Sequence, residues 1–103
     1  MEFLNKVEIK GIVGNVVITD CTTDLKCASF SAVTEHYDKA HNTIEITWWN
    51  CLAWTNQCPN CTEIKKGDHI HVIGRLRTKR VIDAQGRDKP VMEIIAQNIE
   101  FVE

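Results

Sequence analysis

The chain has 103 residues, of which 44% are hydrophobic and 25% are charged, and its formal net charge is −2. This length supplies one domain with one modest hydrophobic core and is too short for two. The composition is that of an ordinary folded protein, which excludes a disordered chain. We therefore expect a single domain over residues 1–103.

The sequence offers no candidate membrane or secretion segment. Its longest apolar runs are about four residues, whereas a helix needs roughly 20 apolar residues to span a bilayer. Residues 1–6 lack the apolar stretch and the cleavage site of a secretory signal. We therefore expect a cytoplasmic protein without membrane contact. In such a chain an odd number of cysteines, five, favours reduced thiols over a disulfide framework.

Alternating apolar and polar residues, together with the turn residues between them, predict five β-strands. The predicted strands cover residues 7–19, 27–34, 44–54, 69–81 and 89–102. The first strand is long and contains Gly11 and Gly14, so we expect it to bend at these glycines. Residues 36–43 are expected to form a loop between the second and third strands.

A short helix of poor quality is expected between the third and fourth strands, within residues 55–66. Pro59 lacks a backbone donor and therefore restricts the helix to a start near that position. Gly67 ends the segment. Five strands with a short helix between the third and fourth is the order of an OB-fold, a five-stranded barrel. The sequence therefore predicts an all-β protein with this fold.

Strand alternation also predicts which side chains face the core. In the second strand Phe30 and Ala32 are expected inside, with Val33 as a further candidate. The last strand is expected to alternate along its whole length. One side then carries Val91, Glu93, Ile95, Gln97, Ile99 and Phe101, and the other carries Met92, Ile94, Ala96 and Val102.

The third predicted strand carries three tryptophans within seven residues. Alternation places Trp48 and Trp54 on one face and Trp49 on the other. Tryptophan is most often a core residue, but three indoles on two faces of one strand cannot all lie in the core. At least one indole is therefore a candidate for stacking on a nucleobase, an interaction worth roughly 1–3 kcal/mol per base.

Positive charge is concentrated in the hairpin between the fourth and fifth strands. The hairpin contains six of the twelve basic residues, namely Arg75, Arg77, Lys79, Arg80, Arg87 and Lys89. Asp83 and Asp88 are its only acids, so the overall charge of −2 conceals a basic arm. Arg75, Arg77 and Lys79 share one strand face, which favours a path for phosphates. The alternative is a hairpin whose charges are simply solvated.

Cys58 and Cys61 form a C-x-x-C motif, which raises the alternatives of zinc binding and redox chemistry. Tetrahedral zinc needs four ligands, and a redox motif is expected at a helix start in a βαβ unit. We therefore favour structural cysteines and expect no metal or other cofactor. The sequence has no Gly-rich phosphate loop, nucleophile elbow or paired-carboxylate motif. We expect neither an enzyme nor a small-molecule substrate, and a purely protein-binding OB domain remains an alternative.

Six segments resemble, in order and spacing, the bacterial single-stranded-DNA-binding protein family. They are residues 5–11 (NKVEIKG), 29–31 (SFS), 48–54 (WWNCLAW), 65–68 (KKGD), 74–78 (GRLRT) and 93–96 (EIIA). The KKG segment followed by the GRLRT strand is the most specific for that family, and the tryptophan segment is the next most specific. The resemblance covers nearly the whole chain.

This resemblance implies that Trp48 and Trp54 stack on bases while Trp49 packs within the protein. It implies phosphate contacts from Lys6, Arg75, Arg77 and Lys79. Two further aromatic platforms of that family fall near His36 or Tyr37 and near Val81, of which Tyr37 could stack and Val81 cannot. The candidate nucleic-acid-binding residues are thus Lys6, Tyr37, Trp48, Trp54, Arg75, Arg77, Lys79, Arg80, Arg87 and Lys89.

The function that the resemblance implies is sequence-independent coating of single-stranded DNA in replication, repair or recombination. It also implies a homodimer or homotetramer built partly through the first strand. The alternative is a primosome or plasmid accessory protein that acts mainly through protein or RNA contacts. RNA remains open because stacking and phosphate contacts do not sense the 2′-hydroxyl. The sequence stops at Phe101-Val102-Glu103 without the acidic tail usual in that family, so either the tail was never present or the sequence is a fragment. A tailless member is expected to coat DNA but not to recruit partners in the usual way.

Overall fold

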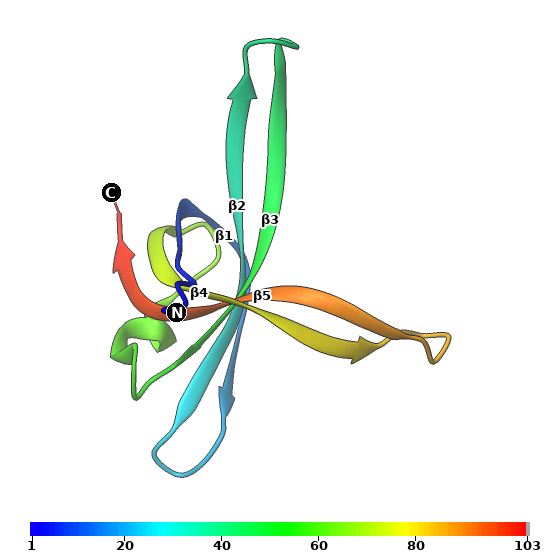
Figure 1. Cartoon of the computed structure of the whole chain (residues 1–103). Helices are drawn as coiled ribbons and strands as arrows, with labels where there is room; N and C mark the ends of the chain where they lie inside the picture. The colour runs from blue at the N-terminus through cyan, green and yellow to red at the C-terminus, as the bar shows by residue number, and fades with distance from the viewer. Residues whose placement is uncertain (103) are drawn as a thin grey trace.

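The computed structural model describes residues 1–102, which form a closed barrel of five strands (Figure 1). The strands are β1 (Val7–Asp20), β2 (Lys26–Asp38), β3 (Thr43–Trp54), β4 (His69–Ile82) and β5 (Asp88–Phe101). Around the barrel they follow the order β1-β2-β3-β5-β4. A short 3₁₀ helix, η1 (Pro59–Glu63), lies between β3 and β4 and begins at the proline. The predicted all-β OB-fold is confirmed.

β1 closes the barrel because it pairs with two neighbouring strands. Residues 7–12 run antiparallel to β4, and residues 12–20 run antiparallel to β2. The ladder with β2 is irregular between Val13 and Val16, around Gly14. One continuous strand therefore serves both neighbours by bending in its glycine-containing part, as the sequence predicts.

The core fills the barrel interior with small and aliphatic side chains. Its largest fully buried side chains are Ile70, Ile94, Val13, Val72, Cys51 and Cys61. Phe30 and Ala32 of β2 are buried as predicted. The inward placement of Val33 is wrong, because alternation after Ala32 turns Val33 to the outer face, where it pairs with Trp48. Among residues 1–102, no helix is long and apolar enough to cross a membrane.

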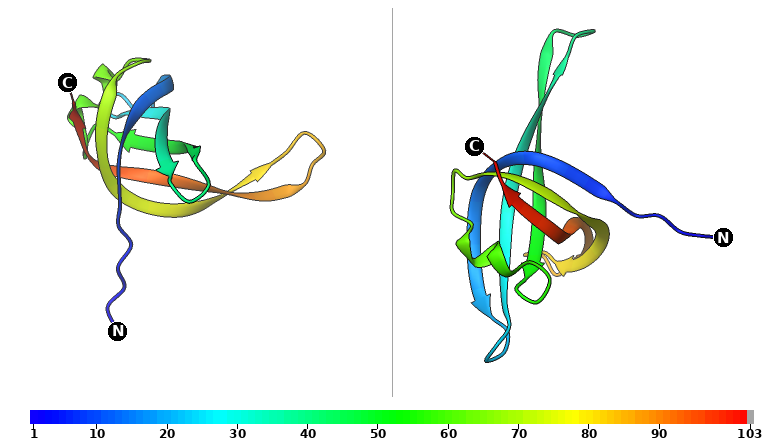
Figure 2. Two further views of the ribbon diagram at one scale, coloured as in Figure 1. Left: turned by 90° about the horizontal axis from the view of Figure 1, so that it is seen from above. Right: turned by 90° about the vertical axis from the view of Figure 1, so that its left-hand side faces the viewer.

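Three hairpins extend from the barrel in different directions, as Figure 1 and the two views of Figure 2 show. The β2–β3 hairpin is longer than predicted, and the expected loop over residues 36–43 is wrong. The ladder continues to the pair Asp38 and Thr43, which leaves a short turn. The Asp38 side chain accepts a hydrogen bond from the Ala40 backbone N–H, and Asn42 adopts a left-handed conformation that asparagine tolerates.

β5 does not alternate along its whole length. Its pairing with β4 shifts at Gly74, which leaves Gln97 as an extra, bulged residue. After this bulge Ile99 lies in the core together with Ile94, so their predicted placement on opposite sides is wrong. At Gly74 a Cβ atom would lie 2.1 Å from the carbonyl oxygen of Ile95, and only glycine fits this close approach.

Candidate nucleic-acid interface

The three tryptophans of β3 are divided between the two faces of the strand as predicted. Trp49 packs against the core, and its indole Nε1–H donates a 2.9 Å hydrogen bond to Thr34 Oγ1. The Trp48 side chain lies on the outer face and is 61% exposed. Trp54 lies on the same outer face and is half-buried. The structure thus leaves two indoles available to a ligand and commits the third to packing.

Trp48 occupies space that β1 leaves open at Gly14. A Cβ atom at position 14 would lie 2.6 Å from Cζ3 of Trp48 and 2.8 Å from Oγ of Ser31. The indole therefore reaches across β2 and rests over the glycine. The Ser31 hydroxyl accepts a hydrogen bond from the Asn15 backbone N–H at 3.0 Å, which ties β1 and β2 together at this point. Gly14 thus leaves the space that the Trp48 ring occupies.

Trp54 lines a pocket of about 320 Å³ that also contains the side chain of Arg75. The pocket is lined by Leu25, Trp54, Asn56, Gln57, Arg75, Ile95, Ala96 and Gln97. A flat aromatic surface, two amides and one guanidinium therefore meet in one hollow. These groups can stack on a base, form hydrogen bonds with it and attract a phosphate.

A groove of about 350 Å³ separates the β4–β5 hairpin from β1 and β2. It is lined by Asn15, Val17, Ser29, Phe30, Ser31, Asn50, Lys79, Val81, Val91 and Glu93. Hydroxyl and amide groups of β2 and β3 form part of the lining, and Lys79 supplies an ammonium group. Ser31 lines this groove and lies on the same outer face of the sheet as Trp48, which does not itself line the groove.

Half of the six basic residues in the hairpin are held by acids. Arg80 pairs with Asp88, with 2.7 Å between Nη2 and Oδ2, and Arg77 pairs with Glu93, with 2.9 Å between Nη2 and Oε1. Arg87 Nε lies 3.0 Å from Oδ2 of Asp83 in the turn. Backbone N–H donation by Arg87 is the main cause that lowers the pKa of the Asp83 carboxyl.

The remaining basic side chains of the hairpin are Arg75, Lys79 and Lys89, which form no ion pair within residues 1–102. Arg75 and Lys79 line the two hollows described above. Alternation directs Arg80 to the opposite face of the hairpin. The structure therefore brings Arg75 and Lys79 to the tryptophan face and does not bring Arg80 there.

Lys6 precedes β1 and is exposed, yet its position is fixed. The side chain of Asn5 donates to the carbonyl oxygen of Leu76 at 2.6 Å and accepts from the Leu76 N–H at 2.9 Å. These bonds continue the ladder in which Val7 pairs with Gly74. Lys6 is thereby placed opposite Arg75 in the register, and two basic residues stand next to each other beside the Trp54 pocket.

Tyr37 lies near the tip of the β2–β3 hairpin, far along the strand from the groove. It shares the outer face with Trp48 and pairs with Ile44, and its hydroxyl donates to Asn42 Oδ1. Ile44 and Ile46 are each about 60% exposed on this face. Tyr37, Ile44, Ile46 and Trp48 thus form an apolar stripe along the hairpin.

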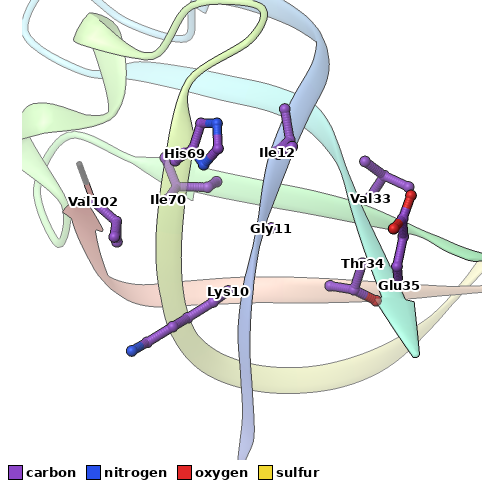
Figure 3. A pocket seen from close by; sticks show the side chains of 9 residues that line it. All are labelled: Lys10, Gly11, Ile12, Val33, Thr34, Glu35, His69, Ile70 and Val102. Carbon is purple, nitrogen blue, oxygen red and sulfur yellow. The ribbon is translucent and has the colours of Figure 1, made fainter. Parts of the chain in front are cut away.

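A further pocket of about 300 Å³ opens where β1 and β2 separate (Figure 3). It is lined by Lys10, Gly11, Ile12, Val33, Thr34, Glu35, His69, Ile70 and Val102. None of these residues lines the groove or the Trp54 pocket, and none was predicted to contact nucleic acid. The candidate interface therefore consists of the other two hollows.

Cys58 and Cys61 of the C-x-x-C motif point into the core. Their thiols donate to the carbonyl oxygens of Ala96 and Ala53 at 3.6 and 3.8 Å. Burial raises the pKa of both thiols, and it raises the pKa of Cys51 to about 12, with a further contribution from Glu93. Within residues 1–102 no three His, Cys, Asp or Glu side chains are grouped as metal ligands would be.

The model of the single-strand binding protein family matches residues 4–102. The chain belongs to this family. It is 27% identical to "Single-stranded DNA-binding protein 1" of Streptococcus pyogenes, an alignment that covers 96% of this chain and 78% of the relative. It is 31% identical to "Single-stranded DNA-binding protein 3" of Streptococcus agalactiae, over 74% of this chain and 56% of the relative.

A third relative, "Single-stranded DNA-binding protein 1" of Lactococcus lactis, is 30% identical over 70% of this chain and 49% of the relative. The chain spans about half the length of two of these three relatives. Among solved structures, the "Plasmodium falciparum SSB complex with ssDNA" superimposes with a TM-score of 0.82, at 22% identity, over 100% of this chain and 98% of the other. This likeness establishes the shared fold.

Sequence reasoning missed several residues of the interface. Gly14 was assigned only to the bend of β1, and Ser31 and Asn50 were not assigned to a site at all. Asn50 and Ile46 alternate in step with Trp48 and Trp54, so the sequence could have placed them on the same outer face of β3. The contact between Gly14 and Trp48 depends on the curvature of the sheet, which the sequence pattern does not contain.

We predict that Gly14→Ala displaces the indole of Trp48 without unfolding the protein, because the obstructing atoms belong to side chains that can move. The measurement is the ¹H–¹⁵N NMR spectrum, in which the indole N–H resonance of Trp48 should shift more than that of Trp49. Trp48→Phe assigns the resonance. An unmoved Trp48 resonance would show that the glycine does not position the ring.

We predict that Ellman's reagent reacts with exposed Cys21 before the buried Cys51, Cys58 and Cys61. The thiolate is the reactive form, so a raised pKa leaves little of it near neutral pH. Cys51 is both inaccessible and protonated near neutral pH, since burial raises its pKa to about 12, so it should not react while the protein stays folded. Guanidinium should expose all five thiols at once. Equal native reaction rates at all five would contradict the burial described here.

Proposed function

We propose that this protein binds single-stranded DNA without sequence preference and coats it during replication, repair or recombination. The observation that carries the proposal is the display of Trp48 and Trp54 on one face of β3, together with two hollows that are each lined by a basic side chain. Arg75 lines the same pocket as Trp54, and Lys79 lines the groove together with residues of β2 and β3. Aromatic platforms beside positive charges are what unspecific single-strand binding requires.

The spacing of the two indoles supports one strand of DNA running along β3. Six residues of extended strand separate Trp48 from Trp54, which corresponds to about 20 Å. One base cannot bridge that distance, so the two indoles would stack on different nucleotides of one strand. The groove with its Ser29, Ser31 and Asn50 side chains lies between the basic hairpin and β1, where the intervening nucleotides would pass.

The relatives' names support this reading, since all three are single-stranded DNA-binding proteins. We infer that the chain is a binding protein rather than an enzyme, and that it acts in the cytoplasm. We also propose that it forms a homo-oligomer partly through β1. RNA is expected to bind as well, because neither stacking nor phosphate contact distinguishes the 2′-hydroxyl.

The tryptophans are expected to divide by role. Trp48→Ala and Trp54→Ala should each weaken binding of oligo-dT by roughly 1–3 kcal/mol, the value of one base stack. Trp49→Ala should instead lower the melting temperature most, because it removes packing and the hydrogen bond to Thr34. Fluorescence anisotropy and thermal melts measure the two effects. A well-folded Trp49→Ala protein that no longer binds, beside normal Trp48→Ala and Trp54→Ala proteins, would reverse the assignment.

Affinity is expected to fall steeply with salt, and Arg75→Ala should reduce the slope of log affinity against log salt by about 0.7. Arg80→Ala provides a matched control in the same strand, because Arg80 pairs with Asp88 on the opposite face and should leave the slope unchanged. The measurement is a series of oligo-dT titrations at increasing salt. Equal slopes for the parent and the Arg75→Ala protein would show that the hairpin is merely solvated.

A further inference from the structure

Two cysteines stand next to each other at the end of the β1–β2 hairpin. The ladder pairs Thr19 with Cys27 and Asp20 with Lys26, and the Cys21 N–H then donates to the Leu25 carbonyl oxygen at 2.8 Å. Cys21 and Cys27 are therefore a diagonal pair on one face of the ribbon. The neighbouring Cys21 side chain is the first cause that raises the pKa of the Cys27 thiol, as expected for two side chains that lie close together. Cys21 is exposed and Cys27 is half-buried, so small molecules can reach the pair.

This thiol pair lies against the Trp54 pocket. Cys27 pairs directly with Trp54 across the β2–β3 ladder, and Leu25 lines the pocket beside the indole. The backbone N–H of Lys26 donates to Oγ1 of Thr55 at 3.1 Å, and the Thr55 N–H donates to the Lys26 carbonyl oxygen at 3.0 Å. A displacement of the hairpin end is therefore transmitted to the segment that holds Trp54.

The other three cysteines differ from this pair in exposure and in the groups that their thiols contact. Cys51, Cys58 and Cys61 are buried, with at most 2% of each residue exposed. Cys58 and Cys61 donate to different carbonyl oxygens in the core rather than to each other. They are internal controls for any reaction at the exposed pair.

We propose that Cys21 and Cys27 form a dithiol modification site that low-molecular-weight disulfides oxidise, and that the resulting disulfide weakens the hold of the Trp54 pocket on a base. The second part rests on the proposed DNA binding. At rest both thiols are reduced, as expected for a cytoplasmic protein, in which disulfides are usually transient and redox-sensing.

The reaction is a thiol–disulfide exchange in two steps. The Cys21 thiolate, formed by loss of its proton to water, attacks one sulfur of the small disulfide, whose S–S bond breaks and releases one thiolate. The Cys27 sulfur, after losing its proton, attacks the Cys21 sulfur of this mixed disulfide and releases the second small thiolate. The two released thiolates take up the two protons. The protein pair is oxidised by two electrons, and the small disulfide is reduced to two thiols.

Closing the disulfide requires the hairpin end to move. Diagonal neighbours in an antiparallel ladder have Cβ atoms up to about 7–8 Å apart, whereas a disulfide holds them at about 3.5–4.5 Å. The turn at residues 22–24 is the part that can move, since it lies outside the strands. Leu25 follows this turn directly, so forming the disulfide would shift Leu25 with respect to Trp54. The shape of the pocket that both residues line would then change.

The chemical part is tested by incubating the whole protein in mixtures of reduced and oxidised glutathione, blocking free thiols with N-ethylmaleimide and digesting with trypsin. Cleavage after Lys26 separates the two cysteines, so the disulfide appears as peptide 11–26 linked to peptide 27–39. We expect this linked pair in the parent and not in Cys21→Ser or Cys27→Ser. Its absence, or an earlier link between Cys58 and Cys61, would overturn the proposal.

The functional part is tested by oligo-dT titration of the reduced and oxidised parent. Oxidation should weaken binding by at least about fivefold, the lower end of the cost of one lost base stack. The Cys21→Ser protein should bind oligo-dT with the same affinity before and after the same oxidising treatment. Unchanged affinity of the fully linked parent would overturn the switch. Failure of the reduced parent to bind oligo-dT would instead refute the proposed DNA binding, while the peptide result would still decide the dithiol site.

Discussion

The structure depends on the double pairing of β1, whose two halves hydrogen-bond to different strands and thereby close the barrel. Closure leaves β3 with one face toward the core and one face toward solvent. The bend that makes the double pairing feasible contains Gly14, which has no side chain beneath the Trp48 indole. One constraint on the backbone therefore shapes both the barrel and the position of an exposed aromatic ring.

The electrostatics of the interface depend on register as much as on composition. Within the β4–β5 hairpin, Arg77, Arg80 and Arg87 form ion pairs with acidic residues. Arg75 and Lys79 instead line the two hollows. Arg77 differs from Arg80 and Arg87, because its partner Glu93 is buried and lines the groove. Among residues 1–102, the six basic residues of this hairpin thereby leave three without an ion pair, and two of these, Arg75 and Lys79, line the hollows.

Much of this arrangement could be predicted from the sequence because it follows from period-two alternation and turn chemistry. The element order, the faces of Trp48, Trp49 and Trp54 and the start of the helix at Pro59 are of this kind. The length of the β2–β3 hairpin was missed because a two-stranded ribbon in solvent needs no buried face, so its polar residues resemble a loop.

Features that depend on exact register escaped sequence reasoning. The bulge at Gln97 reverses the alternation of β5, and no residue type in the segment marks it. The partners of Arg80 and Arg87 depend on which residues the hairpin turn brings together. The proximity of Cys21 and Cys27 likewise follows from the pairing of β1 with β2, although the five cysteines were visible from the start.

The central claim is that two outward indoles hold DNA while the third serves the core. The most direct test uses three proteins that each retain one tryptophan, with phenylalanine at the other two positions, and follows their fluorescence during titration with oligo-dT. Stacking should quench the emission of the proteins that retain Trp48 or Trp54 and leave that of Trp49 nearly constant. Quenching of Trp49 alone, or of none of the three by bound DNA, would contradict the account.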